Sequence, residues 1–208
     1  MYESIIFDMD GTLWDSSKSV ADSWNEVIKT LPDVDITLTA ADIQSIMGLT
    51  MDVIADRFFG TVSKERRMEI MDKCGSHEND YLRIHGGILY PELENTLKKL
   101  RKNHRLFIVS NCQQGYIEAF LDYYKLHEYF EDHLCWGDNT LCKGDNIKLI
   151  IKRNDIKSAV YVGDTQGDCD SAYYAGAEFV HAAYGFGKAD RFLAEISSFA
   201  ELAELKNI

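Results

Sequence analysis

The chain has 208 residues, a formal net charge of −12 and a hydrophobic fraction of 46%. This length fits one domain, or one domain with an inserted subdomain, and allows a core that needs no disulfides. The acidic balance disfavours binding to nucleic acid or to an anionic membrane, because both require clustered Lys and Arg.

The five cysteines are scattered along the chain, and no two are spaced like the ligand pairs of a zinc site. We therefore expect reduced thiols and a cytoplasmic protein. The sequence shows neither a basic and apolar leader at its N-terminus nor a long apolar run. We expect neither secretion nor a membrane span.

The first predicted element is a buried strand at residues 5–7, which runs into Asp8-Met9-Asp10-Gly11-Thr12. Because side chains alternate along a strand, we expect Asp8 and Asp10 to leave the backbone towards the same side. Two carboxylates so close together need a shared proton or a cation. Taken alone, Asp10-Gly11 is equally typical of a simple turn.

The next seventy residues carry apolar side chains at helical spacing and no strand signal. The expected helices are Trp14 to Leu31, Thr39 to Met47, Thr50 to Phe59 and Ser63 to Ile84. Thr39 and Ser63 are predicted N-caps, Asp15 and Ser16 a cap and hinge at the start of the first helix. We expect the large aromatic residues here to form the core of this region: Trp14, Trp24, Phe58 and Phe59.

From Pro91 onwards, helices and strands alternate. The expected strands are Arg105 to Asn111, His133 to Trp136, Ala159 to Val162 and Glu178 to Ala183, and the expected helices are Glu92 to Asn103, Gly115 to Leu126, Asn146 to Lys152 and Phe199 to Leu205. Asp145 is predicted to cap its helix. This alternation predicts an α/β fold with a Rossmann-like, doubly wound parallel sheet. The helical bundle, residues 15–85, is predicted to be a subdomain inserted into a core formed by residues 1–14 and 86–208.

Polar clusters stand at the carboxyl ends of the predicted strands, where ligands bind in such sheets. They are Asp8 with Asp10, Ser110 with Asn111, Lys143, and Asp164 with Asp168. So many carboxylates in one place call for a divalent cation, and oxygen ligands without clustered His or Cys favour Mg²⁺. Magnesium in turn suggests a phosphate substrate.

In order and spacing, Asp8-Met9-Asp10-Gly11-Thr12, Ser110, Lys143 and Gly163-Asp164-x-x-x-Asp168 resemble the four motifs of the haloacid dehalogenase superfamily. The helical insertion after the first motif resembles its phosphoglycolate phosphatase and β-phosphoglucomutase-like group. One departure is Gly144, since many members have Pro after the lysine. Lys143 is preferred to Lys148 and Lys152 because it precedes the predicted helix.

The resemblance implies a role for each motif. Asp8 would be the nucleophile that forms an aspartyl-phosphate, and Asp10 the general acid and base. Magnesium would be held by Asp8, the backbone carbonyl of Asp10 and Asp164, with Asp168 as a further ligand or a supporting residue. Thr12, Ser110, Asn111 and Lys143 would bind the phosphoryl oxygens or the substrate.

The expected activity is hydrolysis of a small phosphate monoester such as a phosphoglycolate-like compound, a sugar phosphate or a nucleotide. A phosphosugar mutase would need a basic residue in the insertion for a second phosphate, and Gly48-Leu49-Thr50-Met51-Asp52 supplies none. A receiver-like domain fits less well because of the helical insertion, and a non-catalytic phosphate-binding module fits less well because all the motif residues are present. The expected partner is a small molecule, and the expected state is a monomer or a weak homodimer.

Overall fold

A six-stranded parallel sheet forms the centre of the computed structural model, which describes residues 1–206 and 208. Its strand order is β5-β4-β1-β6-β7-β8. The strands are β1 (Ser4–Phe7), β4 (Arg105–Ser110), β5 (Asp132–Cys135), β6 (Ala159–Gly163), β7 (Glu178–Ala182) and β8 (Ala194–Ile196). The central strand β1 therefore lies between β4 and β6, where the order of the chain reverses direction.

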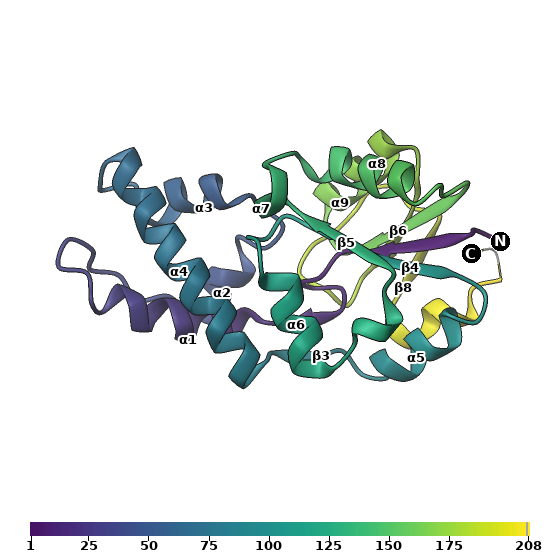
Figure 1. Ribbon diagram of the computed structural model, residues 1–208, viewed down its shortest axis with the longest axis horizontal. Coiled ribbons are helices and arrows are strands. Elements are labelled where there is room, and N and C mark those ends of the chain that lie inside the picture. The colour runs from purple at the N-terminus through teal and green to yellow at the C-terminus, as the bar shows by residue number, and fades with distance from the viewer. Residues whose placement is uncertain (207) are drawn as a thin grey trace.

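Alternating residues of β1 face opposite sides of the sheet. Ile5 and Phe7 belong to one apolar cluster and Ile6 to another. Helices cover both faces (Figure 1). They are α5 (Leu93–Leu100), α6 (Tyr116–Tyr124), α8 (Lys143–Arg153) and α9 (Gln166–Ala175), with the short η1 (His127–Tyr129), α7 (Trp136–Asn139) and η2 (Phe199–Glu204) between or after them. The predicted doubly wound α/β fold is confirmed.

The first four helices of the chain form a helical insertion that stands beside one end of the sheet (Figure 1). They are α1 (Ser17–Ile28), α2 (Ala40–Gln44), α3 (Met51–Phe58) and α4 (Lys64–His85). The predicted N-caps Thr39 and Ser63 are confirmed, since their hydroxyls accept hydrogen bonds from the backbone N–H groups of Asp42 and Arg66. The region thus forms the helices that its apolar spacing predicts, with shorter ends.

Three local predictions are wrong. Trp14 lies in β2 (Trp14–Asp15), not in a helix, and pairs with β3 (Ile88–Leu89) in a two-stranded ribbon at the base of the insertion. Trp136 begins α7 instead of ending β5. Asp145 lies inside α8, which starts after Cys142, and it bonds to the Cys142 thiol and the Tyr174 hydroxyl.

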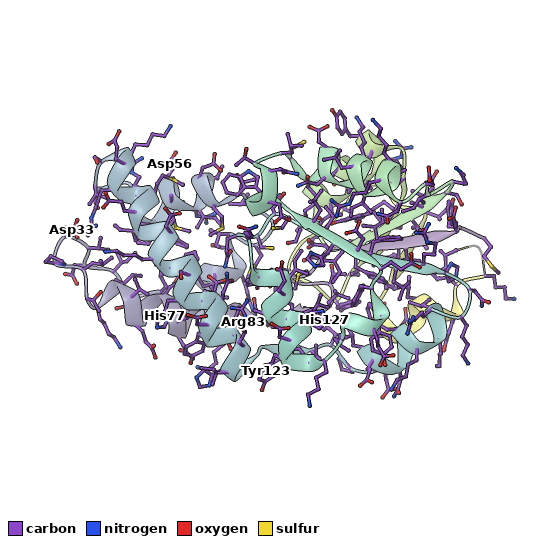
Figure 2. All side chains as sticks on the ribbon, viewed as in Figure 1. Asp33, Asp56, His77, Arg83, Tyr123 and His127 are labelled. Atoms are coloured by element: carbon purple, nitrogen blue, oxygen red, sulfur yellow. The ribbon has the colours of Figure 1, made fainter. Side chains whose placement is uncertain are left out.

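The insertion is also attached to the sheet through α4, which packs on both α1 and α6. Figure 2 labels Arg83 on α4 and His127 after α6. Between them, Asp122 accepts from Arg83 Nε at 3.4 Å and contacts His127 Nε2 at 2.8 Å. These exposed contacts connect α4 of the insertion to α6 and the turn after it. They add little to the free energy of unfolding.

The carboxyl ends of the strands point towards the insertion, and both termini lie at the opposite end of the molecule (Figure 1). A ligand bound beyond the carboxyl ends would therefore lie between the sheet and the insertion. Within the described residues, no helix is both long enough and apolar enough to cross a membrane.

Candidate active site

Asp8 is the first residue after β1, at the centre of the sheet. Its backbone N–H donates to Val162 O on β6 at 2.9 Å, which continues the pairing of the two strands. On the other side, β4 ends at Ser110, two residues beyond the partner of Phe7. Asp8 is buried and lies between the ends of the two neighbouring strands.

Lys143 is the only cation that forms an ion pair with Asp8 among the described residues. As the first residue of α8 it is buried, and its Nζ donates to Asp8 Oδ1 at 2.8 Å and to Asp168 Oδ1 at 2.6 Å. Burial favours the neutral amine, but the charges of Asp168 and Asp8 hold the pKa of Lys143 well above its ordinary value. The amine therefore stays protonated between the two carboxylates.

Asp164 follows β6, and within the described residues one of its carboxylate oxygens has no hydrogen-bond partner. Its Oδ2 accepts from the backbone N–H of Phe186 at 2.7 Å, whereas its buried Oδ1 accepts nothing from the residues that the structure describes. Gly11 and Gly185 enclose the carboxylate so closely that a Cβ on either would overlap it, and Gly11 has a φ of 83°. The backbone is thus shaped around this one carboxylate.

Asp168 has both of its oxygens occupied by the protein. Oδ2 accepts from the backbone N–H of Thr165 at 3.0 Å and from its hydroxyl at 2.7 Å, which forms a capping box at the start of α9. Oδ1 accepts from Lys143. These contacts fix Asp168 in place and make it the residue that orients Lys143.

One oxygen from each of Asp8, Asp164 and Asp168 lies within 4.8 Å of the other two. Opposite oxygens on a single Mg²⁺ are about 4 Å apart, so this cluster is close to the size that the ion requires. Burial and the charge of Asp168 raise the pKa of Asp8 well above its ordinary value and that of Asp164 to about 7. A bound cation would lower both pKa values, so these residues fit a divalent metal ion.

The charge crowding at Asp8 comes from a different residue than the sequence suggests. The carboxylates that raise its pKa most are Asp168 and Asp164, not Asp10. The strand ends at Phe7, so strict alternation does not continue to Asp10, whose side chain meets Ser16 and Tyr116. Asp8 and Asp10 still line one pocket.

Asp10 is held by two hydroxyl groups that the motif analysis missed. Its Oδ1 accepts from Ser16 Oγ and from Tyr116 OH, each at 2.6 Å. Burial raises the pKa of Asp10, and these two bonds act against that rise. Ser16 occupies the N-cap position of α1 but its hydroxyl makes no capping bond, whereas Asp15 Oδ1 accepts from the backbone N–H of Ser17 at 2.9 Å. Tyr116 lies on α6, and no local pattern in the sequence links it to Asp10.

The predicted phosphate ligands differ in their contacts. The Thr12 hydroxyl is buried without a partner among the described residues, and the buried Ser110 lines the same pocket as Asp8. Asn111 Nδ2 donates to Gly48 O of the insertion at 2.8 Å, while its Oδ1 is buried and has no partner in the part of the chain described. The Thr12 hydroxyl is thus available to donate to a ligand, whereas Asn111 joins β4 to the insertion.

A pocket of about 50 Å³ opens beside Asp8 and Asp10, between the sheet and the insertion. Glu78 of α4 lines it and is only 3% exposed. Its two oxygens accept from the Trp24 indole and from Gln113 Nε2, the latter at 3.1 Å. Burial raises the pKa of Glu78 to about 8. Trp24 lines this pocket and also packs in the core of the insertion, as predicted. Glu78 is a site residue that the sequence did not predict.

Comparison with known proteins places this site in a family. Residues 5–182 match the model of the haloacid dehalogenase-like hydrolases. The chain is 30% identical to the phosphoglycolate phosphatase of Aquifex aeolicus, over 88% of this chain and 86% of the relative. A haloacid dehalogenase-like family hydrolase from Streptococcus pneumoniae superposes with a TM-score of 0.83 at 21% identity, covering 98% of this chain and 97% of the other. CbbY of Rhodobacter sphaeroides, solved with phosphate, gives 0.81 at 21% identity, covering 97% and 96%.

Replacing Glu78 by Gln should change how stability depends on pH. The pKa of Glu78 is raised from 4.5 to about 8 in the folded protein. Its neutral form therefore contributes stability that is complete below the unfolded pKa and is lost as pH rises through the folded pKa. Between about pH 5 and about pH 9, the free energy of unfolding of Glu78→Gln relative to wild type should rise by on the order of a few kcal/mol. Urea denaturation measures this difference.

Asp80→Asn is the matched control, because Asp80 lies on the same helix with a side chain that is 79% exposed. Its free energy of unfolding should follow that of wild type across the pH range. An equal pH dependence for wild type and Glu78→Gln would contradict the raised pKa.

Proposed function

Because this chain belongs to the haloacid dehalogenase-like hydrolases, we propose that it is a magnesium-dependent phosphatase that acts through an aspartyl-phosphate on Asp8. The observation that carries this proposal is the buried cluster of Asp8, Asp164 and Asp168 around Lys143. The relatives named phosphoglycolate phosphatase support phosphate monoesters as the substrate class. Within that class, a phosphoglycolate-like compound, a sugar phosphate and a nucleotide are the candidates.

Asp8 and Asp164 are the residues that we expect to hold the magnesium ion through their carboxylates, with Asp10 contributing its backbone carbonyl. The Oδ1 of Asp164, unpartnered among the described residues, supports this, because a buried carboxylate oxygen without a partner is costly. When bound, the ion neutralises negative charge between the nucleophile and the phosphoryl group. Asp168 is proposed to support the site by holding Lys143, since its oxygens already have protein partners.

In the first step, an oxygen of Asp8 attacks phosphorus, and the bond from phosphorus to the ester oxygen breaks. Asp10 gives its proton to the departing oxygen, and in the second step it takes a proton from the water that releases phosphate. Ser16 and Tyr116 occupy Oδ1 of Asp10, so we assign both proton transfers to Oδ2. The raised pKa of Asp10 suits a group that must start protonated.

Donors to the phosphoryl oxygens are proposed to be Thr12, Ser110 and Lys143. The Thr12 hydroxyl, which has no partner within the described residues, supports its role, and the amine of Lys143 lies beside the nucleophile. Asn111 Nδ2 donates one of its two N–H groups to Gly48 O, so we propose that Asn111 ties the insertion to the site and keeps its second N–H for the substrate.

Hydrolysis is favoured over a phosphosugar mutase by the composition of the pocket. Among the described residues that line it, none is Lys or Arg, so a second phosphate would find no cation there. A receiver-like or non-catalytic phosphate-binding module would not need the buried acid at Asp10.

We propose that residues 15–85 act as a cap subdomain over a core of residues 1–14 and 86–208. We also propose that the protein is a monomer or a weak homodimer and that it is located in the cytoplasm. All five cysteines are free thiols, which supports a reducing compartment.

Asp8→Asn should abolish hydrolysis of p-nitrophenyl phosphate, because the amide cannot serve as the nucleophile. Release of p-nitrophenol in the presence of Mg²⁺ measures the effect, and we expect a loss of at least about a thousandfold. Removal of magnesium by a chelator should have a comparable effect on wild type. Asp170→Asn, which changes an exposed aspartate on α9, is the control and should keep full activity. Normal turnover by Asp8→Asn would overturn the proposed mechanism.

Asp10→Asn should accumulate the phosphoenzyme when p-nitrophenyl phosphate is the substrate. Nitrophenolate leaves without a general acid, so the first step proceeds, whereas the second step loses its base. Intact-mass measurement after rapid quenching should detect phosphate on Asp10→Asn and not on wild type. Steady-state turnover equal to that of wild type would show that Asp10 is not the acid and base.

Millimolar Mg²⁺ should raise the melting temperature of the wild-type protein by several degrees, because it binds the folded carboxylate cluster. Asp164→Asn should lose most of this shift, since the amide carries no charge. Thermal unfolding with and without the ion measures it, and no activity is needed. An undiminished shift in Asp164→Asn would exclude Asp164 as a ligand, and Asp170→Asn again provides the control.

A further inference from the structure

Glu78 is the one buried charged side chain of the pocket, among the described residues, that the proposed phosphoryl transfer does not use. It comes from α4 of the insertion, opposite the strand ends. Trp24 donates to its Oε2 and Gln113 to its Oε1, so a hydrogen bond holds each oxygen of the carboxyl group. Such fixed, buried polar groups orient ligands in otherwise apolar sites.

The rest of the wall that the insertion contributes is apolar. It consists of Val20, Trp24, Ile43, Ile46, Met47, Leu49, Met51 and Ile54, together with the backbone at Gly48. Since the phosphate would lie beside Asp8, this wall and Glu78 face the part of the substrate that leaves. The small volume, about 50 Å³, suits a leaving group of few atoms.

The ionisable residues around this space are acidic, and within the described part of the chain no cation is present among them to pair with an anionic ligand. Asp10 and Glu78 both line it, and none of the lining residues that the structure describes is Lys, Arg or His. Lys143 is held by Asp8 and Asp168. A leaving group with a carboxylate would therefore meet two acidic residues and no cation, whereas a hydroxyl or an ammonium group could bond to Glu78.

We propose that Glu78 is a specificity-determining residue that selects small phosphate monoesters whose leaving group carries a hydroxyl or an amine, and that it disfavours those with a carboxylate. This inference rests on the proposed phosphatase function. It removes phosphoglycolate, the compound in the names of the relatives, from the preferred substrates.

The test compares three phosphate esters that share a two-carbon leaving group: 2-hydroxyethyl phosphate, phosphoethanolamine and 2-phosphoglycolate. For wild type with Mg²⁺, kcat/KM for the first two should exceed that for 2-phosphoglycolate by about tenfold or more, which is the effect of one hydrogen bond with a charged group. A preference for 2-phosphoglycolate would overturn the inference. This comparison requires only the wild-type chain.

Glu78→Gln then tests the residue itself. The ratio of kcat/KM for phosphoethanolamine to that for 2-phosphoglycolate should fall by about tenfold, mainly through KM, because the amide, unlike the carboxyl group, cannot ionise to pair with the ammonium. Asp80→Asn, on the exposed side of α4, should leave the ratio unchanged. An unchanged ratio in Glu78→Gln would overturn the role of Glu78.

Activity on p-nitrophenyl phosphate distinguishes failure of the substrate preference from failure of the proposed phosphatase function. Wild type that hydrolyses this compound but prefers 2-phosphoglycolate would refute the substrate class and leave the phosphatase intact. Wild type that hydrolyses none of the four compounds would refute the phosphatase and the inference with it.

Discussion

The ion pairs of one buried lysine hold the site together. Lys143 contacts Asp8 and Asp168 with its amine, and Asp164 adds a third carboxylate nearby. One positive charge cannot balance three negative ones in a buried place, and the raised pKa values of Asp8 and Asp164 express that imbalance. Three buried carboxylates around one amine are costly by themselves, and a divalent cation would offset that cost.

The parallel sheet explains why the sequence was informative about this cluster. Asp8, Ser110 and Asp164 each lie at or just after the end of a buried strand, and parallel strands bring their carboxyl ends to one edge. A short apolar run with a polar end is readable without a structure, which is why the fold class and the family were predicted and are confirmed by the comparisons. Lys143 could be chosen over its neighbours in α8 for the same reason, because only a residue at the start of that helix lies at this edge.

The residues that were missed come from the packing of helices against each other. Tyr116 reaches Asp10 across 106 positions of sequence, and Glu78 meets Trp24 across 54. The contact of Glu78 with Trp24 depends on the angle at which α4 and α1 pack, and that of Tyr116 with Asp10 on where α6 lies against the loop after β1. Apolar periodicity gives only the face of a helix, not these placements. The two-residue strands β2 and β3 were missed because so few residues show no periodicity. Asp8 and Asp10 line one pocket, but β1 ends at Phe7, so strand alternation is not what brings them together.

A short segment after β4 connects the two halves of the site. Asn111 donates to Gly48 in the insertion, Gln113 donates to Glu78 on α4, and Tyr116 donates to Asp10 beside the nucleophile. Any movement of the insertion away from the sheet must therefore break bonds made by the same segment that positions Asp10. The positions of Glu78 and Asp10 are for this reason linked through residues 111–116, because each bond restricts the positions that the others can adopt.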